Sequence, residues 1–199
     1  MKIKIVIVVL LFGSSCMLFG KTKKSYIYSG GAQIHIGYGF VKSNYGLLQG
    51  VPLGIGGRMH FNLGKYFRIG SGGAVTSFTY KNSLSATSEY YEKNYLEIGY
   101  GGLTAEFMYR IGDFKVALGV LLGGGAIKNL HILTDNGDGT IDSVLTEYAA
   151  FIVMPTLIFE YFVTDSISLH IQVDYLMSNK ILSDFQLGPR IYLGVFFNK

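Results

Sequence analysis

The feature that most constrains this chain is a repeated two-residue alternation of apolar and polar side chains. The stretch ISLHIQVDY, residues 167–175, shows it without interruption. Its odd-numbered positions are apolar, and its even-numbered positions are Ser, His, Gln and Asp. Because successive side chains of a β-strand point to opposite faces, the pattern predicts a strand with one apolar and one polar face. It does not by itself decide which face lies inside.

Similar alternation recurs along the chain and predicts eight strands. They are expected at 32–40, 51–63, 67–76, 96–110, 114–123, 151–162, 167–175 and 185–197. In the fourth strand, the apolar residues change from even-numbered to odd-numbered positions at Gly101-Gly102, which predicts a glycine β-bulge there. With this bulge, Leu96 is expected on the outer face and Glu97 on the inner face.

The connections between these strands fall into two classes. Tight turns are expected near Gly64, Gly112 and Asp165. Longer polar connections are expected around 42–49, 81–93, 134–143 and 177–183. Tight turns at one end and long connections at the other predict an all-β, antiparallel, up-and-down arrangement of hairpins.

Glycine indicates which face lies inside. The polar face holds many of the 27 glycines, which weaken strands and have no use on a solvated surface. The interior of an eight-stranded barrel is narrow and needs small side chains among large ones. The other face is apolar and aromatic in every expected strand, which a barrel in water would not display. We therefore predict an eight-stranded transmembrane β-barrel with its polar face inward and its apolar face on lipid.

This pattern resembles the small eight-stranded outer-membrane β-barrel proteins of the broad OmpA/OmpX/OmpW type. The most specific element is the last strand, where Ile191, Leu193, Val195 and Phe197 alternate toward the end of the chain. The resemblance implies contact with outer-membrane lipid and recognition by the barrel-assembly machinery. Asn198-Lys199 after the aromatic residue departs from the family pattern. No subfamily signature matches, so no functional residue is transferred.

The first residues have the layout of a secretory signal peptide. Lys2 and Lys4 precede an apolar run that is too short for a membrane span, and small residues follow it. We expect a cleaved signal peptide at 1–20, a barrel domain at 26–199, and the outer membrane of a Gram-negative-type envelope as the location. Cys16, the only cysteine, leaves lipidation at that residue as an alternative.

Charged side chains at expected inward positions form the candidate site, which we call the lumen ion network. Its predicted members are Arg58, Arg68, Glu97, Glu106, Arg110, Lys115, Glu160, Asp174 and Arg190. Their charges nearly balance, and buried charges need partners, so a closely paired network is expected.

Other chemistry has weaker support. His35, His60 and His170 share the inward face but lack a metal-binding spacing, and we interpret them as lumen-filling residues. The stretch TDNGDGTID, 134–142, resembles part of a calcium loop, but Leu145 stands where the loop needs Glu. A lipid-modifying enzyme would need a nucleophile and base at a recognisable spacing, and none is found. We expect no catalytic residue, metal or cofactor.

These observations predict a non-catalytic, monomeric barrel that serves envelope structure or surface interaction through its long loops. An extracellular surface partner stays open as an interpretation of these loops. A narrow channel for small or hydrophobic solutes is the alternative. A soluble lipocalin-type barrel ranks third, because its polar face should be outside and poor in glycine. The net charge of +4 includes leader lysines, and no basic patch indicates a nucleic-acid partner.

Overall fold

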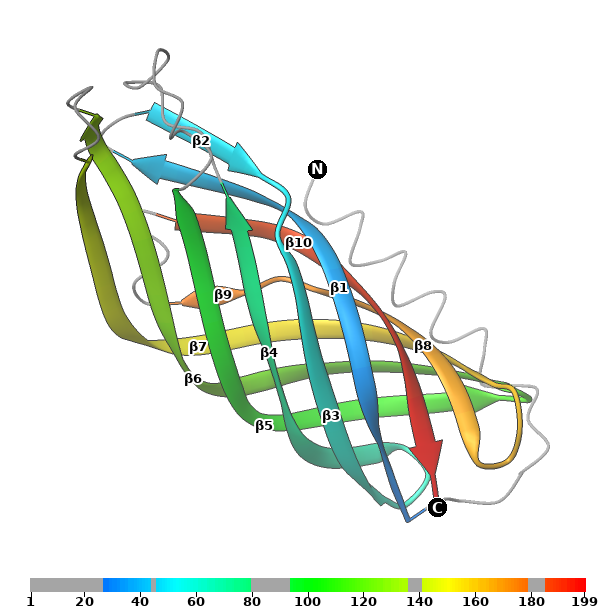
Figure 1. The fold of residues 1–199 in the computed structure, drawn as a ribbon. Helices are drawn as coiled ribbons and strands as arrows, with labels where there is room; N and C mark the ends of the chain where they lie inside the picture. Colours follow the sequence, from blue (N-terminus) through cyan, green and yellow to red (C-terminus); the bar gives the residue numbers. More distant parts are fainter. Residues whose placement is uncertain (1–26, 44–45, 80–93, 136–140, 179–184) are drawn as a thin grey trace, which may run out of the picture.

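A computed structural model describes residues 27–43, 46–79, 94–135, 141–178 and 185–199 as one closed antiparallel sheet (Figure 1). Its strands are β1 (Tyr28–Ser43), β2 (Gly46–Gly50), β3 (Leu53–Leu63), β4 (Phe67–Thr79), β5 (Tyr95–Ile111), β6 (Phe114–Asp135), β7 (Ile141–Phe162), β8 (Ile167–Asp174), β9 (Met177–Ser178) and β10 (Phe185–Asn198). Within these residues, no helix is long and apolar enough to cross a membrane.

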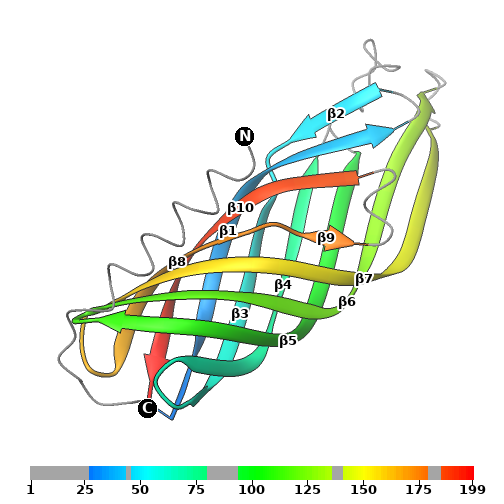
Figure 2. The ribbon, with the colours of Figure 1, turned by 180° about the vertical axis from the view of Figure 1, so that it is seen from behind.

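The ten segments make eight barrel strands, which confirms the predicted fold class. β2 and β3 both pair with β1, and β8 and β9 both pair with β7. Each pair of segments therefore acts as one strand with a break. The remaining strands are paired in chain order, as a meander of hairpins requires (Figure 2). The expected signal peptide, residues 1–20, lies outside the described residues.

Pairing between the first and last strands closes the barrel. β1 and β10 pair antiparallel from Ser29–Asn198 to Val41–Phe185, with one shift between Gly37 and Gly39. The Lys199 carbonyl O accepts hydrogen bonds from the backbone N–H groups of Ile27 and Tyr28. The two residues that depart from the family pattern at the end of the chain thus extend the closing ladder.

The three predicted tight turns are confirmed at one end of the barrel. Gly64 and Gly112 adopt positive φ values of 82° and 60°, which L-residues with side chains rarely adopt. Gly112 is the first residue of a two-residue connection, where a type II′ turn requires such a conformation. In the third turn, the Thr164 hydroxyl accepts hydrogen bonds from the backbone of Ser166 and Ile167. We call this the turn end and the opposite one the loop end.

At the loop end, two connections are shorter than predicted because strands continue into them. β1 and β2 pair as far as Ser43–Gly46, and β6 and β7 pair as far as Asp135–Ile141. The polar residues in these stretches thus do not end the strands, because ladder hydrogen bonds depend on the backbone rather than on side-chain polarity. Residues 80–93, 136–140 and 179–184, which hold most of the other expected loop positions, lie outside the described residues.

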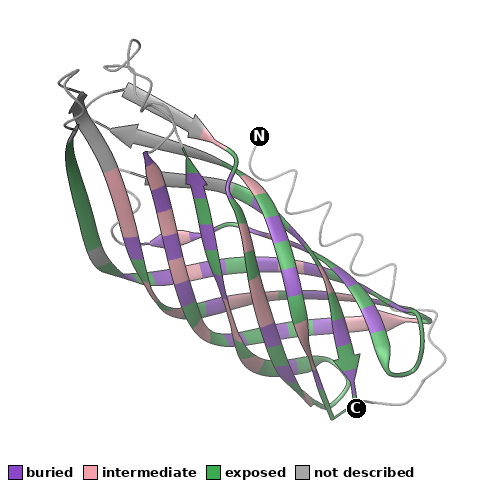
Figure 3. Cartoon of the chain, in the orientation of Figure 1, coloured by how far each residue is buried: buried purple, intermediate pink, exposed green. Residues whose placement is uncertain are grey.

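The predicted facing is confirmed for most of the barrel. In β8, Leu169 and Ile171 are exposed on the outer face, whereas His170, Gln172 and Asp174 are buried. The same alternation of buried and exposed residues runs round the barrel (Figure 3). The apolar side chains thus cover the outside, and the narrow interior is filled by the other face.

The facing predicted for the first part of β5 is wrong. Leu96, Ile98 and Tyr100 are buried in the lumen, and Glu97 lies on the outer face between them. The expected bulge at Gly101-Gly102 is absent, because β5 keeps its register with both β4 and β6 through these glycines. The parity change reflects a change in what fills the lumen, from apolar at the loop end to polar at the turn end.

The outer face has an apolar band with different borders at its two ends. Near the turn end, Tyr66 stacks on Phe107 and Tyr109, and Phe114 contacts Tyr161. Outward positions on β6 are uncharged from Phe114 to Ala126. With about 3.3 Å per residue and a tilt of about 40°, this stretch is about 30 Å tall, close to the apolar band of membrane barrels.

Beyond the band lies a row of charged residues on three adjacent strands, which we call the charged row. Glu97 of β5 pairs in register with Lys128 of β6, which pairs with Glu147 of β7. Lys128 Nζ lies 3.4 Å from Glu147 Oε1, and both side chains are about half exposed. The charged row marks where the wall leaves the hydrocarbon.

Closure of the ladder predicts resistance to SDS. A barrel has no free sheet edge and keeps its backbone hydrogen bonds in detergent until it is heated. Boiled and unboiled samples of the purified protein should therefore migrate differently on a gel. Identical migration, or recovery of the protein without detergent in the soluble fraction, would contradict a membrane barrel.

The alternation in β8 predicts which side chains contact lipid. In a Cys16→Ser background, a membrane-soluble thiol label should react with Ile171→Cys and spare Gln172→Cys. Ile171→Arg should lower the free energy of unfolding by roughly 2–4 kcal/mol, as expected for a lipid-facing charge near mid-membrane. Preferential labelling of position 172 would reverse the assignment of the two faces.

Candidate functional site

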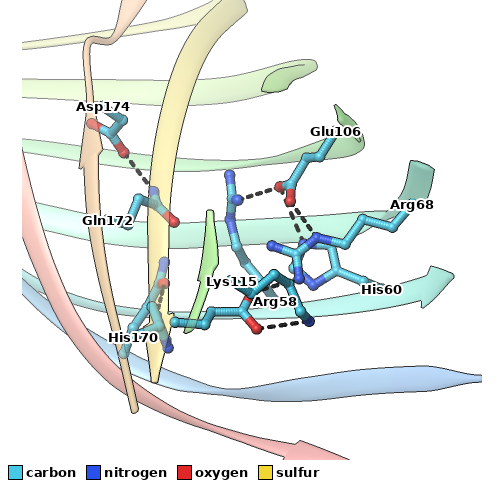
Figure 4. Close-up of polar contacts among 10 residues, drawn as sticks. Arg58, His60, Arg68, Glu106, Lys115, His170, Gln172 and Asp174 are labelled. Atoms are coloured by element: carbon cyan, nitrogen blue, oxygen red, sulfur yellow. Dashed lines mark hydrogen bonds and ion pairs between the residues drawn. The ribbon is translucent and has the colours of Figure 1, made fainter. Parts of the chain in front are cut away.

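The turn-end half of the lumen contains a continuous set of ion pairs, which we call the polar layer (Figure 4). Glu106 Oε1 accepts from Arg58 Nη1 at 2.7 Å, and Glu106 Oε2 accepts from Arg68 Nε at 2.5 Å. Arg68 also donates to Glu160 Oε1 at 2.6 Å. Lys115 Nζ lies 2.9 Å from Glu160 Oε2. Each carboxylate therefore lies between two cations.

The polar layer ties distant strands together across the lumen. Arg58 comes from β3, Arg68 from β4, Glu106 from β5, Lys115 from β6 and Glu160 from β7. Their side chains are at most 5% exposed. Removing one partner from a buried pair leaves an uncompensated charge, so these contacts depend on one another.

A second polar group lies farther from the turns and centres on Arg190 of β10. Its Nε donates to Asp174 Oδ1 at 2.9 Å, and Gln172 donates to the other carboxylate oxygen at 3.0 Å. Arg190 also donates to the Thr76 hydroxyl and the Tyr100 hydroxyl, both at 3.2 Å. One buried guanidinium thus links β10 to β8, β4 and β5.

Toward the loop end, the lumen is filled by an apolar layer. Its buried side chains are Ala74, Phe78, Leu96, Ile98, Tyr100, Leu121, Ile127, Ala150, Ile152, Met154, Leu176 and Tyr192. The Tyr100 and Tyr192 hydroxyls lie 2.8 Å apart at the border with the Arg190 group. Packed aliphatic and aromatic side chains exclude water, so the lumen has polar and apolar fillings in series.

The three inward histidines are held by separate neighbours. His35 Nε2 lies 2.7 Å from Thr76 Oγ1, and His60 Nε2 lies 3.2 Å from Glu106 Oε1. His170 Nε2 lies 3.1 Å from Gln33 Oε1, and its ring stacks on Phe196 with centroids 3.8 Å apart. Among the described residues, no group of three or more His, Cys, Asp and Glu side chains could hold a metal ion. The calcium-like stretch falls mostly in residues 136–140, outside the described residues.

Two predicted members of the lumen ion network have other positions. Glu97 belongs to the outer charged row, because β5 runs without the expected bulge. Arg110 lies beside the Gly112 turn, where its Nε donates to the Gly112 carbonyl O at 3.0 Å. Its guanidinium lies 3.9 Å from the centroid of the Phe162 ring. All the other predicted members lie in the polar layer or in the Arg190 group.

Sequence reasoning missed the apolar layer and the neutral partners of Arg190. A signal for the first was present, because residues 151–162 are apolar on both faces apart from Thr156 and Glu160. A strand that is apolar on both faces fits a barrel whose lumen is itself apolar at that level. Thr76 and Tyr100 gave no such signal, since their role depends on where Arg190 reaches across the barrel.

One hollow described in the structure lies on the outer wall rather than at a polar site. It measures about 820 Å³ and runs over β10, β1, β3 and β4. Its aliphatic lining includes Ile34, Ile36, Leu53, Ile55 and Ile191. These side chains belong to the band that we assign to lipid. His35 and Ser77 also line the hollow, and His35 Nε2 is held by Thr76 Oγ1.

Solved structures of bacterial outer-membrane proteins share this fold. Neisserial surface protein A, NspA, is 14% identical, with a TM-score of 0.52, over 89% of this chain and 100% of that one. Ail, the attachment invasion locus protein of Yersinia pestis, is 16% identical, with a TM-score of 0.51, over 86% of this chain and 98% of its own. Ail in complex with the heparin analogue sucrose octasulfate is 17% identical, with a TM-score of 0.50, over 86% of this chain and 99% of its own.

No protein-family model matches the chain, and no curated protein sequence matches it. The structural likenesses, at such low identity, define the fold. The chain has the architecture of the small eight-stranded outer-membrane β-barrels, as the resemblance of its sequence predicted.

The polar layer predicts unequal effects for two glutamates of the same strand. Glu106→Gln leaves Arg58 and Arg68 without their shared carboxylate, and breaking such a buried pair costs roughly 3–5 kcal/mol. Glu97→Gln changes an outer residue and should cost less than about 1 kcal/mol. The heat-modifiable gel shift, followed across a urea titration, measures both. Equal stability of the two variants would contradict the paired polar layer.

Proposed function

We propose that this protein is an integral outer-membrane barrel without catalytic activity, which serves envelope structure or surface interaction rather than solute passage. The observation that carries the proposal is the doubly filled lumen. The polar layer and the apolar layer lie in series, so a solute or ion would have to displace both. An eight-stranded barrel leaves little further space for an aqueous path.

The outer surface supports residence in a membrane. The apolar band has the height of a bilayer core, with stacked aromatic residues at the turn end and the charged row at the loop end. The sequence features of a signal peptide at 1–20 fit export to that membrane. The alternating β10 fits recognition by the barrel-assembly machinery, since it is the strand that closes the barrel on β1.

The loop end supports a role in contact with other molecules. β6 and β7 pair beyond the last pair between β5 and β6, Tyr95–Leu130, and end at Asp135–Ile141 (Figure 1). Residues 142–147 on this extension are exposed. A two-stranded extension beyond the wall presents side chains and backbone away from the lipid, where a surface partner would bind.

A closed lumen predicts electrical silence. The purified protein in planar bilayers should show no stable conductance steps, because packed apolar side chains exclude water and ions from the loop-end half. Glu106→Gln should also remain silent at temperatures where it is folded, since it leaves the apolar layer intact. A wide outer-membrane porin inserted under the same conditions provides the positive control. Large, stable openings of the native protein would overturn the proposal and favour the narrow channel.

A further inference from the structure

Glu97 is the starting point for a further inference because it lies on the outer wall instead of in the lumen. Its neighbour across the ladder is Lys128, and Lys128 pairs with Glu147. The charged row therefore alternates acid, base and acid on three adjacent strands. Opposite charges on neighbouring strands stabilise the ladder within one chain. The same order makes the row complementary to its own copy, because a two-fold axis between an acid and a base sets each opposite the other.

The wall below the charged row is unusually smooth. Gly99, Gly101, Gly124, Ala126 and Ala149 occupy adjacent outward positions on β5, β6 and β7. Small residues at an interface in lipid let two backbones approach closely. The smooth wall and the charged row together form one surface, which we call the β5–β6 face.

The outward glycines of this face are not required by the barrel itself. A methyl group at Gly101 would lie 3.7 Å from its nearest neighbour, the Gly72 carbonyl O, and one at Gly124 would lie 3.7 Å from the Ala150 carbonyl O. At Gly99 the nearest atom would be a Val75 methyl at 3.9 Å. These are ordinary contacts. The inward Gly102 and Gly123 differ, since a methyl group at either would collide with the backbone of the neighbouring strand.

Glycine weakens a strand. Outward glycines that no contact within the barrel requires therefore indicate that another backbone approaches the wall closely from outside. We propose that the β5–β6 face binds a second copy of this chain in the membrane, with a two-fold axis along the membrane normal between Glu97 and Lys128. This axis places Glu97 opposite Lys128 of the other copy, and Lys128 opposite Glu97. The sequence alone favoured a monomer.

Barrel geometry limits the contact to a small patch. Strands tilt by about 35–45°, so facing strands of two parallel barrels cross at about 70–90° and separate quickly away from the axis. The reciprocal ion pairs lie at the axis, and Gly99 and Ala126 next to them let the walls come close enough for the charges to meet. Such a contact is smaller than a standard protein interface, so the dimer is reversible and depends on protein density in the membrane.

The experiment measures dimerisation of the full protein in phospholipid bilayers by single-molecule photobleaching at several protein-to-lipid ratios. The native protein should show a dimer fraction that rises with density. Glu97→Lys and Lys128→Glu should each weaken dimerisation by roughly tenfold, and the double variant should recover most of it, because the reciprocal pairs return with reversed sign. A native protein that is monomeric at every density, or a double variant no better than the single ones, overturns the proposal.

Matched alanines on opposite walls test the face independently of charge. In a Cys16→Ser background, Ala126→Cys on β6 should cross-link between copies with a short bifunctional thiol reagent, whereas Ala32→Cys on β1 should not.

Bulky substitutions test the same face. Gly99→Leu should reduce dimerisation and Ala32→Leu should leave it unchanged, with the gel shift showing that both variants fold. Equal cross-linking at the two positions, or a dimer insensitive to Gly99→Leu, also overturns the proposal. None of these outcomes alters the conductance on which the proposed function is tested.

Discussion

The pairing of β1 with β10 is the constraint on which the rest of the structure depends. In lipid, every backbone donor and acceptor must be satisfied within the protein, and a sheet achieves this only when its edges meet. Here the closing ladder runs from Ser29–Asn198 to Val41–Phe185, and the Lys199 carbonyl O extends it. Closing with eight strands fixes a narrow lumen, and a narrow lumen must be filled by the side chains that point into it.

The two fillings of the lumen use different physics. At the turn end, carboxylates are held between pairs of cations, so that burial is offset by Coulomb attraction and hydrogen bonds within the network. At the loop end, Leu96, Ile98, Ile127 and Ile152 pack as in the core of a soluble protein. The Arg190 group joins the two, because Arg190 pairs with Asp174 and also contacts Tyr100 and Met154. A barrel filled in this way resembles a folded core surrounded by lipid more than a pore.

The function that we propose therefore depends on the outside of the barrel. The wall presents an apolar band, the charged row and a smooth β5–β6 face, while the β6–β7 extension continues beyond the last β5–β6 pair. Each of these surfaces faces either the lipid or the medium outside the membrane. A rigid, closed barrel suits such a role, because it holds surface residues in fixed relative positions without needing an active site of its own.

Alternation and turn residues were enough to predict the strands, their order and most of their facing. Period-two alternation in residues such as 167–175 requires two unlike faces, and Gly64 and Gly112 permit the turns that join neighbouring strands. It also placed Arg58, Arg68, Glu106, Lys115, Glu160, Asp174 and Arg190 at inward positions. Which charges meet depends on the folded barrel, because Arg68 reaches Glu160 across strands far apart in the chain. The fold alone placed Glu97 outside. Hydrophobicity marks a lipid face only where the lumen is polar, and at the level of Ile98 the lumen itself is filled by apolar side chains.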